Sequence, residues 1–69
     1  MDTNKLAGYM REKGFTYDTL AEKSGISRST IARILNGDNA TIGQIYKLID
    51  ALEMPKDLIL SIFFPNTIC

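Results

Sequence analysis

The sequence contains no histidine and no tryptophan, and its one cysteine is Cys69. A single thiol forms no intramolecular disulfide, and without histidine or a cysteine cluster no zinc site can be assembled. The absence of disulfides is typical of proteins from a reducing compartment, so we expect a cytoplasmic protein. We expect no metal, no cofactor and no small-molecule ligand.

Catalytic groups are scarce as well. The sequence offers no histidine as a general base, no carboxylate pair in an evident pocket and no nucleophile with an activating neighbour. The five glycines form no phosphate-binding motif. An enzyme is therefore the weakest of the function classes considered.

Long apolar runs and net charge are also missing. The longest apolar run covers residues 58–64 and is interrupted by Ser61, whereas a membrane span needs roughly 18 apolar residues. No apolar stretch follows a basic start, which argues against secretion. Eight basic and eight acidic residues give a net charge of zero, which excludes a general polybasic nucleic-acid binder.

The composition that remains is that of a small globular protein, with 69 residues of which 45% are hydrophobic. A single domain over residues 1–69 buries only about 60% of the surface that the unfolded chain exposes. Without a disulfide or a metal, it must rely on helix packing, on helix caps or on a partner chain. We therefore expect a compact all-α bundle that is a homodimer when active.

Glycine, asparagine and proline divide the sequence into five segments with helical spacing of apolar residues. We predict helices over residues 3–13, 17–24, 28–36 and 42–54, and a fifth that begins at Pro55 and ends before Pro65. Thr16 and Ser27 are predicted N-caps, and Thr41 with Gln44 forms a capping box. Two apolar faces are expected to point inward: Ile31, Ile34 and Leu35, and then Ile42, Ile45, Leu48, Ile49 and Leu52.

Residues 16–37 carry the clearest pattern. Their two short helical segments are joined by only three residues, 24–26, so the helices must cross steeply and nearly touch. Ala21 supplies a small side chain at the crossing, Gly25 accepts a positive φ in the connection, and Ile31 fills the angle between the helices. This is the steric pattern of a helix-turn-helix unit.

With these residues and the following Leu35-Asn36-Gly37-Asp38-Asn39-Ala40, the chain resembles the phage repressor and Cro-type helix-turn-helix proteins, the XRE-like regulators. The resemblance covers nearly the whole chain. It implies a lambda-repressor-like five-helix bundle that binds operator DNA as a symmetric dimer. The family often has glutamine at the positions of Tyr17 and Arg28, and an arginine at position 28 shifts the expected base preference from adenine toward guanine.

In this geometry the second helix of the unit enters the major groove with its N-terminal end first. We predict base contacts from its outward residues: Arg28, Ser29, Thr30 and Arg33. Arginine can bond bidentately to guanine O6 and N7, and hydroxyls can bond any base edge. Residues 23–36 contain three cations and no anion, which favours a basic face over a merely solvated one.

Phosphate contacts are predicted at the helix N-termini, where backbone N–H groups attract anions. Thr16, Tyr17 and Ser27 stand at these ends, and the family resemblance adds Asn36 and Asn39 in the loop that follows the second helix. Tyr17 can equally be a partly buried packing residue, and the two asparagines can be ordinary turn residues.

The dimer interface is predicted at the end of the fifth segment and comprises Phe63, Phe64 and Ile68. So small a bundle can hardly bury two adjacent phenylalanines completely, and exposed apolar patches mark contact surfaces. The alternative for these side chains is packing in the core.

Together these observations predict a sequence-specific DNA-binding transcriptional regulator, a repressor of phage or mobile-element type that binds a pseudo-palindromic operator as a dimer. The alternative is a protein-interaction module on the same fold, an antitoxin or anti-repressor with weak or no DNA binding. The basic character of residues 28–36 favours the regulator, and the salt dependence of binding to random duplex DNA separates the two.

Overall fold

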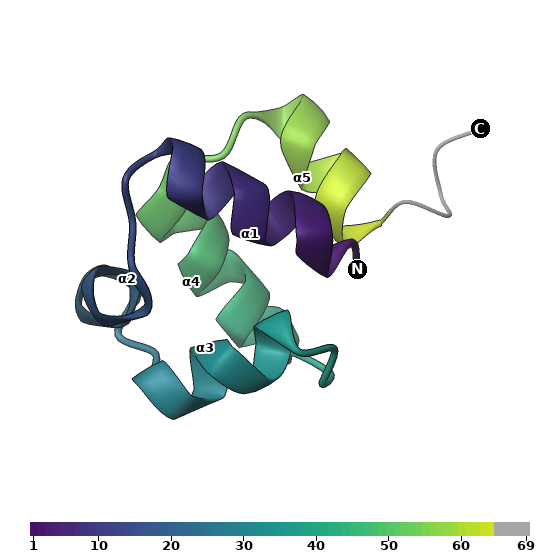
Figure 1. Ribbon diagram of the computed structural model, residues 1–69. Coiled ribbons are helices and arrows are strands. Elements are labelled where there is room, and N and C mark those ends of the chain that lie inside the picture. Colours follow the sequence, from purple (N-terminus) through teal and green to yellow (C-terminus); the bar gives the residue numbers. More distant parts are fainter. Residues whose placement is uncertain (65–69) are drawn as a thin grey trace.

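The computed structural model describes residues 1–64, and these form five helices and no strand. The helices are α1 (Thr3–Glu12), α2 (Tyr17–Ser24), α3 (Arg28–Leu35), α4 (Ile42–Leu52) and α5 (Lys56–Phe63). α2 packs against α3 and α4, while α1 contacts α3 and α5 (Figure 1). The predicted all-α helix-turn-helix bundle is confirmed. None of the five helices is long and apolar enough to cross a membrane.

Side-chain caps fix where four of the helices begin. The Asp2 carboxylate accepts a hydrogen bond from the backbone N–H of Lys5 at 3.1 Å, and the Thr16 and Ser27 hydroxyls cap α2 and α3 as predicted. The capping box of Thr41 and Gln44 is present at the start of α4. Each such cap contributes about 1 kcal/mol to helix stability, which is considerable for helices of eight to eleven residues.

The helix ends differ from the prediction by one or two residues. α4 ends at Leu52, two residues early, because Glu53 adopts the left-handed conformation with φ 51° and ψ 49°. α1 and α3 each end one residue earlier than predicted. Pro55 is the N-cap of α5 and not its first helical residue, since its ψ of 156° is extended.

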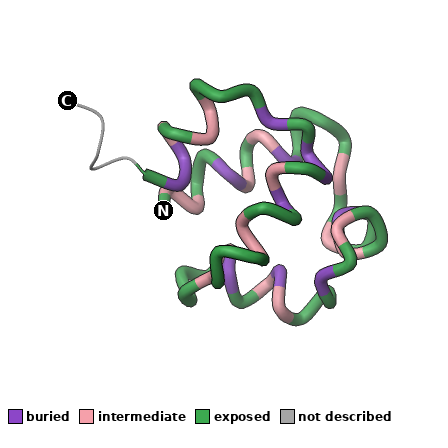
Figure 2. The backbone as a smooth tube through the Cα atoms, turned by 180° about the vertical axis from the view of Figure 1, so that it is seen from behind, coloured by how far each residue is buried: buried purple, intermediate pink, exposed green. Residues whose placement is uncertain are grey.

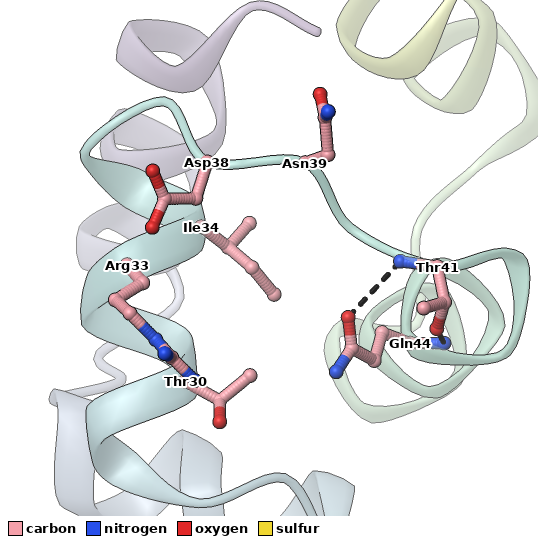
Figure 3. A pocket seen from close by; sticks show the side chains of 7 residues that line it. All are labelled: Thr30, Arg33, Ile34, Asp38, Asn39, Thr41 and Gln44. Carbon is pink, nitrogen blue, oxygen red and sulfur yellow. Dashed lines mark hydrogen bonds between the residues drawn. The ribbon is translucent and has the colours of Figure 1, made fainter.

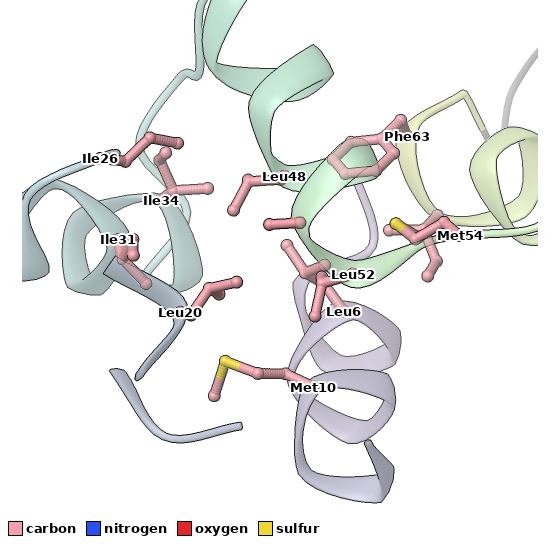
Figure 4. Packing of buried hydrophobic residues seen from close by; sticks show 12 residues of the cluster. Leu6, Met10, Leu20, Ile26, Ile31, Ile34, Leu48, Leu52, Met54 and Phe63 are labelled. Carbon is pink, nitrogen blue, oxygen red and sulfur yellow. The ribbon is translucent and has the colours of Figure 1, made fainter. Parts of the chain in front are cut away.

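The core is formed by one apolar face from each helix and by one residue from each of the connections α2–α3 and α4–α5 (Figures 2 and 4). Its buried members are Leu6, Met10, Leu20, Ile26, Ile31, Ile34, Leu48, Ala51, Leu52, Met54, Ile62 and Phe63. Complete burial of one leucine or isoleucine side chain stabilises the fold by about 1.5–3 kcal/mol. No polar or charged residue among residues 1–64 is buried, so α3 is held in place by its apolar face.

Two apolar residues are placed differently from the expectation. Phe63 is only 6% exposed and packs in the core, the alternative that the sequence also allowed, while Phe64 is 40% exposed. Successive residues on a helix point about 100° apart, so burial of one phenylalanine turns its neighbour outward. Ile42 is 62% exposed because it is the first residue of α4, beyond the edge of the core. Ile68 lies outside the described residues.

Candidate nucleic-acid interface

The connection between α2 and α3 has the predicted geometry. Gly25 has φ 77° and ψ 9°, and its backbone N–H donates to the carbonyl of Ala21 at 2.9 Å. This left-handed residue ends α2 and turns the chain toward α3 within three residues. Ile26 and Ile31 are both buried beyond the turn, and they fix the angle between the two helices from the inside.

α3 has two chemically distinct sides. Ile31 and Ile34 are 1% and 2% exposed and anchor the helix to the core. Arg28, Ser29 and Arg33 are exposed, so three of the four predicted base-contacting residues project from the molecule.

The fourth, Thr30, is half-buried. Its hydroxyl accepts a hydrogen bond from the Ser27 hydroxyl at 2.7 Å, and its backbone N–H donates to the same Ser27 oxygen at 3.2 Å. Thr30 therefore belongs to the cap of α3 as much as to its outer face.

The guanidinium of Arg28 lies against two consecutive residues of α2. Its Nε is 2.9 Å from Oδ1 of Asp18, and its Cζ is 6.0 Å from the centre of the Tyr17 ring. Sequence analysis missed Asp18 as part of this surface, because it lies ten residues before Arg28. The only signal in the sequence is its place in the first turn of α2, which the helix dipole explains equally well.

A second acidic residue, Glu53, pairs with a cation of residues 23–36 although it lies outside that stretch of the sequence. Lys23 at the end of α2 is 3.5 Å from a carboxylate oxygen of Glu53, and its amino group also lies 5.5 Å from the ring of Phe15. Of the three cations in residues 23–36, Arg33 is the one without an ion pair among the residues that the structure describes.

The helix N-termini predicted to bind phosphate are partly satisfied by the chain itself. The backbone N–H of Thr16 donates to the Thr19 hydroxyl at 2.8 Å, and the Ser27 hydroxyl is used in capping. Tyr17 is half-buried and packs against the core.

The loop after α3 borders an open hollow of about 280 Å³ between α3 and the start of α4 (Figure 3). The hollow is lined by Thr30, Arg33, Ile34, Asp38, Asn39, Thr41 and Gln44. The fold thus brings Arg33 and Asn39 to the same hollow. Asn36 is exposed as the C-cap residue of α3, and its backbone N–H donates to the carbonyl of Ala32 at 3.0 Å.

Comparison with known protein families agrees with this geometry. A family model described as helix-turn-helix matches residues 6–59, from within α1 to within α5. No curated protein and no solved structure matches the chain. Because the family match covers more than half of the sequence, the chain belongs to the XRE-type helix-turn-helix family of DNA-binding transcription regulators, which are typically not enzymes.

Proposed function

We propose that this regulator is a repressor that binds a pseudo-palindromic operator as a homodimer and blocks a promoter by occupying it. The observation that carries the proposal is the two-sided character of α3. Ile31 and Ile34 hold the helix rigidly on the core, while Arg28, Ser29 and Arg33 are exposed on it. A recognition helix needs both properties, because base contacts require side chains that project from a fixed backbone.

Each residue of the surface has a proposed role. Arg28 and Arg33 bond guanine bidentately, since a guanidinium offers only donors and guanine presents two acceptors in the major groove. Ser29 and Thr30 supply further base contacts. The phosphate backbone is held by the region of Thr16, Tyr17 and Ser27 and by the loop residues Asn36 and Asn39, mainly through backbone N–H groups.

The charge of the surface predicts how binding responds to salt. Two of its three cations are paired with carboxylates, so few phosphates are neutralised. Each neutralised phosphate adds about 0.9 to the slope of log affinity against log salt concentration. We therefore expect weak non-specific binding with a small slope, and selectivity that comes from base contacts.

Dimerisation is proposed to use the exposed apolar side chains near the end of α5. Phe64 and Leu60 are 40% and 39% exposed and lie one helical turn apart. The backbone N–H of Asp2 bonds to the carbonyl of Ile62, so Met1, which is 40% exposed, is close to the same end. In a dimer on DNA, the two α3 helices would enter major grooves about 34 Å apart.

The test begins with selection of preferred sequences from a randomised duplex library. The mass of the resulting complex should correspond to two chains per duplex, and the selected site should be a pseudo-palindrome. One chain on a site without symmetry would refute the dimeric mode of binding.

On the selected duplex, the double variant Arg28→Ala/Arg33→Ala should lose selection, at a cost of about 1–3 kcal/mol of base discrimination per arginine. Footprinting and competition with random duplex measure the loss, and circular dichroism checks that the fold is retained. Arg11→Ala removes an exposed arginine from α1 and serves as the control. If the double variant protects the same site with undiminished affinity, α3 is not the recognition helix.

A further inference from the structure

Arg28 differs from Arg33 in what surrounds it. Arg28 contacts the Asp18 carboxylate through Nε and faces the Tyr17 ring, whereas Arg33 makes no ion pair within residues 1–64. We infer that Asp18 is a positioning residue for base recognition, which holds the Arg28 side chain in the orientation that selects guanine. This inference rests on the proposed function.

The contact does little for folding. The side chains of Arg28 and Asp18 are 67% and 78% exposed, and an ion pair so exposed to solvent contributes little to stability. Its main effect is on the conformational freedom of the Arg28 side chain. A free arginine side chain has many rotamers, and it loses this freedom when it binds a base. Asp18 and Tyr17 restrict Arg28 before DNA arrives, so less entropy is lost on binding.

The contact also leaves the right donors for a base. The contact with Asp18 is made at Nε, while the guanidinium carries four further N–H groups on Nη1 and Nη2. No other partner of the Arg28 terminal amino groups occurs among residues 1–64. Donation from both terminal amino groups matches the O6 and N7 acceptors of guanine, and it does not match adenine, which presents one acceptor and one donor.

The charge of Asp18 has a second consequence. A carboxylate in the first turn of α2 stands where backbone N–H groups would otherwise attract a phosphate. It repels the DNA backbone at every sequence and therefore weakens non-specific binding. Asp18 thus strengthens recognition of one base pair while it lowers affinity for all other DNA, and these two effects are separable by experiment.

The experiment measures binding of the whole protein to the selected duplex, to duplexes with each base pair changed singly, and to random duplex. In Asp18→Ala, discrimination at the guanine read by Arg28 should fall about two- to tenfold. Discrimination at the other base pairs should stay the same. Affinity for random duplex should rise about twofold, because one repelling charge near the DNA has been removed.

Glu22→Ala is the matched control, since Glu22 is an exposed carboxylate one turn further along α2 with no ion pair within the described residues. It should leave discrimination unchanged at every base pair. In the Arg28→Ala background, Asp18→Ala should cause no further loss of discrimination.

Three outcomes decide the matter. If discrimination in Asp18→Ala equals that in Glu22→Ala, or falls equally at all base pairs, Asp18 does not position Arg28, although the proposed function stands. If the unaltered protein shows no sequence preference, the proposed function fails and this inference with it. A loss confined to the Arg28 base pair, and absent from the Arg28→Ala background, supports the positioning role.

Discussion

The helix pairs α2–α3 and α4–α5 are each joined by a short connection that contains one left-handed residue. The side chains that the two pairs expose nevertheless differ in chemical character. At α2–α3 that residue is Gly25, and the exposed side chains include Asp18, Arg28 and Arg33. At α4–α5 it is Glu53. Both pairs bury an apolar face in the same core, so the difference between them lies in their exposed side chains.

The second pair exposes several large apolar side chains beside its charged residues. Tyr46 and Ile42 on α4 are 68% and 62% exposed, and Leu60 on α5 is 39% exposed. A polar, donor-rich surface is suited to a nucleic acid, whereas exposed apolar side chains are suited to another protein surface. The comparison is the reason for proposing DNA binding at α2–α3 and self-association at α4–α5.

The largest expected effect is a loss of folding stability when a buried isoleucine of the first pair is replaced by alanine. The same substitution of an exposed isoleucine in the second pair is the comparison. Ile31→Ala on α3 should cost about 2–5 kcal/mol of folding free energy, because the side chain is 1% exposed and leaves a cavity. Ile42→Ala on α4 should change stability by less than about 0.5 kcal/mol. Chemical denaturation followed by circular dichroism measures both.

Should Ile31→Ala fail to fold, Ile31→Val should still cost about 0.5–1.5 kcal/mol. Equal losses at positions 31 and 42 would contradict the division between a core-facing and an exposed isoleucine.

An intermediate effect is expected at the glycine between α2 and α3. A Cβ added to Gly25 meets no atom within 4 Å, so Gly25→Ala introduces no clash. It places a side chain at φ 77°, where the left-handed conformation costs roughly 1–2 kcal/mol. Thermal unfolding should show this loss.

Gly8→Ala is the control for that loss. Gly8 lies within α1, and a Cβ added there meets no atom within 4 Å outside the backbone of its own helix, so alanine should stabilise α1 by about 0.5–1 kcal/mol. The same chemical change thus has opposite signs at positions 8 and 25. A loss at both positions would mean that backbone conformation does not govern the result.

The smallest effect concerns the left-handed residue of the other connection. Glu53→Gly should stabilise the fold by about 1 kcal/mol relative to Glu53→Ala, because glycine adopts φ 51° without strain. Both variants lose the contact with Lys23, whose 3.5 Å distance and exposure make it a minor contribution. Equal unfolding midpoints for the two variants would show that position 53 is not strained.

Local signals explain what was predicted correctly. The caps at Thr16, Ser27 and Thr41 depend on side chains that reach a backbone N–H three residues away, so the sequence contains all the participants. The positive φ of Gly25 and the burial of Ile31 follow in the same way from a three-residue connection between two helices.

Where the prediction was wrong or incomplete, the deciding partner is distant or the periodicity is ambiguous. Phe63 and Phe64 are both apolar, and only the packing of α5 along α1 selects which of them is buried. Ile42 continues the apolar spacing of α4, but the core ends before it reaches that residue. The spacing of apolar residues along a helix predicts which side of the helix faces the core. It does not predict how far along the helix the core extends.

The amino-acid sequence alone determined the five helices, the angle between α2 and α3 and the exposed arginines, because caps, turns and helical periodicity act over a few residues. The tertiary structure alone decided the charge of the surface that those arginines form. It placed Asp18 beside Arg28 and Glu53 beside Lys23, and electrostatic partners are set by distance in space and not by separation along the chain.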